Sequence, residues 1–158
     1  QFMGSITSFN SKYDEVRKGN LKFNIQEEKG YQLFKKHCNS CHSEPLFTDY
    51  SFRNNGIDSV FNDKGRFMVS LNKKDIGLFK VPTLRNISLT YPYMHDGRFR
   101  TLEEVVNHYS GFVNRSETLD TLLSNPFKLS VEEKGNLIVF MKTLTDYQLL
   151  TNSNISEP

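Results

Sequence analysis

The 158-residue sequence lacks the features that several large protein classes require. It has no apolar run of the ~20 residues needed to cross a bilayer, and its mean hydropathy of −0.54 is polar. Its formal net charge is only +2, with 20 basic residues interspersed among 18 acidic ones, which argues against nucleic acid as a partner. It has no internal repeat and no low-complexity segment. The sequence therefore predicts one small domain with no membrane span.

Cysteine is also scarce, because the only two copies stand in the pentapeptide Cys-Asn-Ser-Cys-His at 38–42. On one helical turn, Cys38 and Cys41 point the same way and are spaced to bond two haem vinyl carbons, with His42 beneath the porphyrin as the proximal iron ligand. A zinc site would need four ligands, and no second Cys/His pair stands at finger spacing. A redox dithiol would need a βαβ setting, which is missing. The pentapeptide is therefore interpreted as the attachment site of a c-type haem.

Three capping boxes, each an Asn, Ser or Thr with a Glu three residues later, predict the starts of three helices. They stand at Asn24, Thr101 and Ser130. The first predicted helix runs to about His37 and delivers the cysteines at its end. The second carries Tyr109 on its inward face, and the third presents an apolar stripe over 137–144.

The remaining segments are less regular. Residues 2–13 fall near helical spacing and predict an amphipathic helix, residues 14–22 read as a linker, and 151–158 as a disordered tail. The Gly-, Asn-, Asp- and Pro-rich stretch 43–89 predicts long loops with a brief hairpin, which a haem makes acceptable because loops can pack on it. We therefore expect an all-α, class I cytochrome c-like domain over 23–150, with helices and long loops around one covalent haem.

The second axial ligand of the iron decides the chemistry, because methionine raises the potential, histidine lowers it and tyrosinate favours ferric and higher states. Met94 lies in an irregular aromatic loop, and Tyr109 faces inward from the next helix; periodicity does not choose between them. The other candidates are weaker because of their positions: Met141 on a core stripe, His37 beside the haem motif, His108 on a solvated helix face and Met68 in a polar loop.

Several segments together resemble the bacterial dihaem cytochrome c peroxidase family, including its MauG-type members. They are residues 8–14, the haem motif with 45–49, and 79–86, extended by 90–97 and 101–109. In that family two cytochrome c-like domains each carry one haem. The resemblance implies that this chain is the C-terminal haem domain, preceded at 1–22 by the terminal helix and linker of another domain.

The resemblance also implies roles for individual residues. His42 would be the proximal ligand of a six-coordinate electron-transfer haem, while the haem of the N-terminal domain reacts with peroxide. The family's second ligand falls fourteen residues after His95, at Tyr109, where standard peroxidases have Met and MauG-type enzymes have Tyr. We therefore expect tyrosine ligation and a low potential, with Met94 as the alternative. The backbone carbonyls of Thr90 and Pro92 match the family's interdomain calcium site, and oxygen ligands suit that ion.

The expected function follows from these roles. The chain would be the electron-transfer domain of a periplasmic dihaem peroxidase that reduces hydrogen peroxide or uses it to oxidise a protein partner. Its partners would be the N-terminal haem domain of the same protein and an electron-donor protein or protein substrate; alone, it would lack the peroxidatic haem. Lys80 or Arg85 is a further candidate, for pairing with a haem propionate. The alternative is a free-standing monohaem cytochrome that only shuttles electrons.

Overall fold

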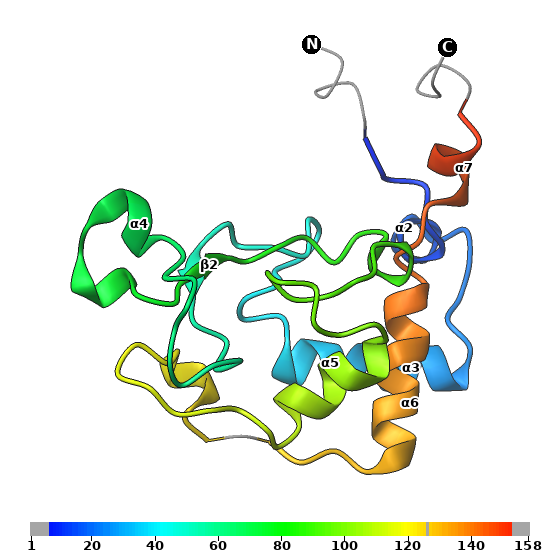
Figure 1. Ribbon diagram of the computed structural model, residues 1–158. Helices are drawn as coiled ribbons and strands as arrows, with labels where there is room; N and C mark the ends of the chain where they lie inside the picture. Colours follow the sequence, from blue (N-terminus) through cyan, green and yellow to red (C-terminus); the bar gives the residue numbers. More distant parts are fainter. Residues whose placement is uncertain (1–6, 126, 153–158) are drawn as a thin grey trace.

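The computed structural model describes residues 7–125 and 127–152. The elements in this part of the chain are α2 (Lys12–Arg17), α3 (Ile25–His37), β1 (Phe52–Arg53), α4 (Phe67–Ser70), η1 (Lys73–Asp75), β2 (Phe79–Lys80), η2 (Ile87–Leu89), α5 (Leu102–Tyr109), η3 (Thr121–Leu123), α6 (Val131–Lys142) and α7 (Tyr147–Leu150). Helices and loops dominate, as Figure 1 shows, so the chain has the predicted all-α character.

The crossing of α3 and α6 forms the frame of the domain, and α5 packs beside it (Figure 1). The helices approach closely at Gly30, where an added Cβ would lie only 2.0 Å from the Asn136 carbonyl oxygen. Phe34 and Phe140 fill the space around this crossing and are fully buried, with ring centroids 5.2 Å apart. The core therefore depends on a glycine that lets two helix backbones meet.

All three predicted capping boxes are present in the structure. The side chains of Asn24, Thr101 and Ser130 accept hydrogen bonds from the backbone N–H three residues on, and the glutamate at that position bonds back. Each box satisfies N–H groups that a helix start leaves without partners. The predicted starts of α3, α5 and α6 are therefore confirmed.

The N-terminal segment differs from the sequence-based expectation. Residues 2–6 of the predicted opening helix lie outside the described residues, and α2 begins only at Lys12 after a capping box between Ser11 and Asp14. Helix α2 therefore occupies part of the predicted linker. Asp14 is buried and binds the Arg85 guanidinium through both carboxylate oxygens, at 2.9 and 3.0 Å. Arg85 anchors α2 to the loops and is not available to a propionate, so that suggestion was wrong for Arg85.

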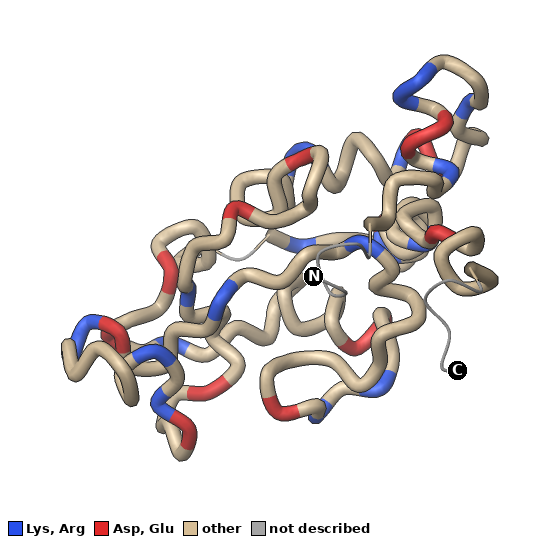
Figure 2. The backbone as a smooth tube through the Cα atoms, turned by 90° about the horizontal axis from the view of Figure 1, so that it is seen from above, with Lys and Arg blue, Asp and Glu red and all other residues tan. Residues whose placement is uncertain are grey.

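The long segment 43–89 is irregular, as predicted, but the pairing within it is not a tight hairpin. Strands β1 and β2 pair antiparallel, with Phe52 opposite Lys80 and Arg53 opposite Phe79. The chain between them forms a protruding lobe that carries α4 (Figure 1). Figure 2 shows basic and acidic residues interspersed along the backbone tube. Among the described residues, no helix combines the length and apolar character that a membrane crossing demands.

Candidate haem site

A cavity of about 440 Å³ lies among α3, α5, α6 and the long irregular loops. Its lining includes Cys38, Cys41 and His42 from the haem motif, together with Met94 and Tyr109. The volume falls in the range of about 300–1,000 Å³ that is typical of cofactor pockets. The residues predicted to attach the haem and to bind its iron from either side thus line one cavity.

The haem motif follows directly from α3 and continues its helical course for one turn. The Cys38 N–H donates to the Phe34 carbonyl at 2.8 Å, and the His42 N–H donates to the Cys38 carbonyl at 2.9 Å. Both cysteines are free. Burial, reinforced by Cys41, raises the pKa of the Cys38 thiol to about 12, and burial also raises the pKa of Cys41. Both groups are therefore protonated thiols at neutral pH, turned toward the same cavity.

Among the residues that the structure describes, the His42 ring is hydrogen-bonded through Nδ1 alone. Nδ1 lies 3.1 Å from the carbonyl oxygens of both Phe47 and Pro82, so it carries the proton and donates. This tautomer leaves Nε2 with a free lone pair. Burial lowers the pKa of His42, although the two carbonyls oppose the shift. The imidazole is therefore neutral and oriented, as an iron ligand needs to be.

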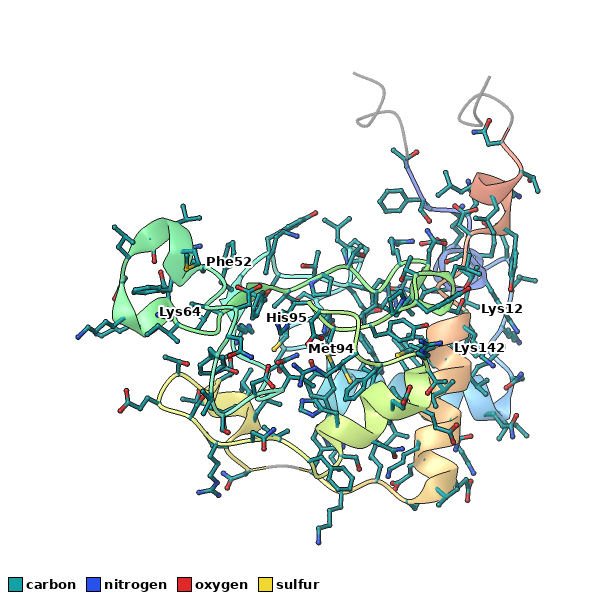
Figure 3. The ribbon with its side chains drawn as sticks, in the orientation of Figure 1. Lys12, Phe52, Lys64, Met94, His95 and Lys142 are labelled. Atoms are coloured by element: carbon teal, nitrogen blue, oxygen red, sulfur yellow. The ribbon has the colours of Figure 1, made fainter. Side chains whose placement is uncertain are left out.

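The side chains of Tyr109 and Met94 both contact Asn55, a residue that was not among the candidates predicted from the sequence. The Asn55 side-chain nitrogen lies 3.4 Å from the Tyr109 hydroxyl oxygen and 3.4 Å from the Met94 sulfur. Burial raises the pKa of Tyr109 to about 12, and the Asn55 amide opposes this shift. Met94 lies near the centre of the molecule in Figure 3. Nothing in the local pattern around Asn55 indicated this position.

His108 was predicted to face solvent, and this was wrong. Only 4% of its surface is exposed, and its Nε2 lies 2.9 Å from the Asn55 carbonyl oxygen. Burial lowers the pKa of His108 despite that bond, so the neutral ring donates its proton. The error arose because the 54–57 turn covers this face of α5, and the periodicity of a helix does not report what a distant loop covers.

The other candidate ligands occupy different environments. Met141 is buried in the core and also lines the cavity, as does His37, whose ring stacks on Phe127 at 4.2 Å. Met68, in α4, is 65% exposed and is not among the lining residues. Lys80 lines the cavity, with its ammonium 4.9 Å from the Tyr50 ring centroid.

Thr90 and Pro92, the predicted carbonyl ligands of calcium, both line the cavity. Within the described ranges, no group of three or more His, Cys, Asp or Glu side chains is arranged to hold a metal ion. That finding does not test a site made of backbone carbonyls. The calcium site therefore stays a prediction.

A neutral imidazole with one free nitrogen, two adjacent thiols and a walled cavity fit a haem and its iron. Fold and site together define a cytochrome c domain, and the family model for cytochrome c matches residues 27–145. Cytochrome c551 peroxidase from Nitrosomonas europaea is 36% identical over 94% of this chain and 43% of its own length. The methylamine utilization protein MauG from Methylophilus methylotrophus is 36% identical over 74% of this chain and 36% of its own length.

The solved structures agree with these relatives. A MauG-like protein associated with microbial copper homeostasis superposes with a TM-score of 0.85 at 31% identity, over 96% of this chain and 52% of that one. The chain belongs to the cytochrome c family and, within it, to the group of bacterial dihaem cytochrome c peroxidases and MauG. It spans less than half the length of the two curated relatives.

Proposed function

We propose that this chain is the electron-transfer haem domain of a dihaem peroxidase and that it holds one haem c covalently. The observation that carries the proposal is the convergence of Cys38, Cys41, His42 and Tyr109 on one cavity. When bound, the haem supplies an iron that exchanges one electron.

Each residue of the site has a definite task in this proposal. The Cys38 and Cys41 thiols add to the two vinyl groups of the haem and fix it to the end of α3. His42 binds the iron through Nε2, and the carbonyls of Phe47 and Pro82 hold its ring by Nδ1. Tyr109 supplies the second protein ligand and lowers the potential relative to methionine, with Met94 as the alternative.

The activity proposed for the whole protein is reduction of hydrogen peroxide, or its use to oxidise a protein partner. The cytochrome c551 peroxidase and MauG relatives support this, and their greater length leaves room for the second haem domain that the proposal requires. The partners are that N-terminal domain and an electron-donor protein or a protein substrate. The proposal also includes a periplasmic location, because thioether attachment takes place outside the reducing cytoplasm. It further includes a calcium ion bound by the backbone carbonyls of Thr90 and Pro92.

Haem attachment is tested by mass spectrometry of the chain produced in a host that matures c-type haem. The expected mass exceeds that of the polypeptide by one haem, and the haem stays attached in denaturant. Cys38→Ala and Cys41→Ala should each leave one thioether, whereas Ser40→Ala, between them and exposed, should match the wild type. A colourless protein with the mass of its amino acids alone would refute the proposal.

The division of labour between two haems has its own test. The haem-loaded chain should show no steady turnover of hydrogen peroxide, because His42 and Tyr109 would both bind the iron and leave it no open site for peroxide. Sustained turnover by the isolated chain contradicts this. An upstream coding sequence containing a second Cys-x-x-Cys-His motif supports the dihaem enzyme, whereas its absence favours a free-standing monohaem cytochrome.

A further inference from the structure

Two side chains of different chemical softness meet at one amide in the haem cavity. The Asn55 nitrogen lies 3.4 Å from the Met94 sulfur and 3.4 Å from the Tyr109 oxygen, so one amide contacts both candidate ligand atoms. Met94 comes from the 91–97 loop and Tyr109 from the end of α5, and both line the cavity together with His42.

Asn55 is fixed in the orientation that presents its NH₂ group to both side chains. Its side-chain oxygen accepts a hydrogen bond from the Ile57 N–H at 3.2 Å, and its backbone carbonyl accepts one from His108 Nε2 at 2.9 Å. Because the oxygen is already engaged, the nitrogen is the atom turned toward the cavity. His108 adjoins Tyr109 in the chain, so the same contact ties the end of α5 to the Asn55 turn.

Met94 reaches the cavity from an uncommon backbone conformation. Its φ is +72°, in the left-handed region that non-glycine residues rarely adopt. The loop holds it there through a bond from the Gly97 N–H to the Met94 carbonyl at 3.3 Å and through the pairing of Tyr93 with Phe99. Strained conformations of this kind cluster at ligand clamps, where the surrounding structure maintains them. The loop therefore fixes the position from which the Met94 side chain enters the cavity.

We propose that Tyr109 and Met94 are alternative ligands of one haem iron, Tyr109 in the ferric state and Met94 in the ferrous state. This proposal rests on the haem site proposed above. An anionic phenolate oxygen is a hard donor that stabilises ferric iron, whereas a neutral thioether is a soft donor that suits ferrous iron. Asn55 donates a hydrogen bond to whichever side chain is released.

The exchange is balanced in electrons and protons. A one-electron donor, a reduced c-type cytochrome or dithionite, reduces the iron; the bond from Tyr109 oxygen to iron breaks and a bond from Met94 sulfur to iron forms. The released phenolate takes one proton from solvent, because an unpaired phenolate is costly to bury. Oxidation reverses each change.

The test compares resonance Raman and absorption spectra of the haem-loaded chain in both oxidation states. In Met94→Leu, the ferric spectrum should keep its tyrosinate bands, while the ferrous iron loses its sixth ligand and binds carbon monoxide about tenfold faster or more. In Tyr109→Phe, the tyrosinate bands should disappear and the ferrous spectrum should stay unchanged. The exposed residues Met68 and Tyr147 supply the controls Met68→Leu and Tyr147→Phe, which should match the wild type in both states.

Other outcomes overturn the proposal. If Met94→Leu leaves ferrous carbon monoxide binding unchanged, Met94 is not the ferrous ligand, and if it alters the ferric spectrum, the assignment of the two states is wrong. Should Tyr109→Phe fail to fold, the Met94 variant alone still decides. Failure of the proposed function would give a different result from failure of this inference. In that case the wild-type chain would carry no haem and would show neither the ferric nor the ferrous haem spectrum.

Discussion

Replacing Gly30 by alanine tests whether the close crossing of α3 and α6 holds the domain together. In an ordinary helix interior this change stabilises by about 1 kcal/mol, since alanine has the better helix propensity. Here the new Cβ would lie 2.0 Å from the Asn136 carbonyl oxygen and 2.8 Å from the Phe140 Cβ. Ordinary van der Waals contact needs 3.4–4 Å, so the helices must separate by more than 1 Å.

That separation loosens the packing of Phe34 on Phe140, where both rings are fully buried. Overpacking of this severity costs about 3 kcal/mol, at the upper end of the usual range. After the propensity gain, a net loss of about 2 kcal/mol in the free energy of unfolding is expected. With a urea m-value of about 2 kcal/mol per molar, the midpoint should fall by about 1 M.

Gly135 provides the matched control for this prediction. It lies in α6 and is exposed, and an added Cβ there meets nothing within 4 Å. Gly135→Ala should therefore raise the free energy of unfolding by roughly 0.5–1 kcal/mol. Urea titrations of the haem-loaded proteins, followed by far-UV circular dichroism, measure both changes. A Gly30→Ala protein at least as stable as the wild type would refute the reasoning.

Two further predictions concern buried polar groups outside the haem cavity. Burial alone would raise the pKa of Asp14, but hydrogen bonds from Arg85 and Ser11 outweigh this effect and lower the pKa. The ionised Asp14 therefore contributes its full stabilisation above the unfolded pKa of about 3.9, and this contribution is lost as the pH falls through the lower folded pKa. Asp14→Asn should lower the free energy of unfolding by about 3 kcal/mol at neutral pH and by progressively less in acid. Urea titrations at several pH values measure this, and a difference between variant and wild type that does not change with pH would contradict it. Asn54→Ala removes the hydrogen bonds that the side chain donates to Ser116 and Thr118 and the one that it accepts from the Gly56 N–H. The free energy of unfolding should fall by roughly 2–3 kcal/mol in a urea titration, and an unchanged value would contradict this prediction.

The parts of the fold that the sequence predicted correctly are those encoded by neighbouring residues. A capping box lies within four residues, so the starts of α3, α5 and α6 could be placed from Asn24, Thr101 and Ser130 alone. The haem motif is equally local, and its helical turn follows α3 as predicted. The inward position of Tyr109 depended only on the period of one helix.

The parts that were missed depend on contacts between distant segments. His108 is buried because the 54–57 turn, more than fifty residues earlier, lies over it. Arg85 is buried because Asp14 reaches it across 71 residues of sequence. Neither contact leaves a periodic signal, and an isolated Arg or His on a polar segment reads as solvated by default.

The same distinction between local and distant contacts holds within the haem site. The residues proposed to attach the haem and bind the iron mostly sit on or next to helices, so motif spacing and periodicity could place them. Asn55 comes from the irregular segment 43–89, parts of which line the cavity and which contains the paired strands β1 and β2. The inward face of a helix named Tyr109 as a candidate ligand, and an aromatic loop named Met94. The environment that Asn55 and its turn create around both side chains depends on contacts between distant segments. That environment brings both atoms to one amide, and this shared contact is what supports the proposal that Tyr109 and Met94 are alternative ligands of one iron.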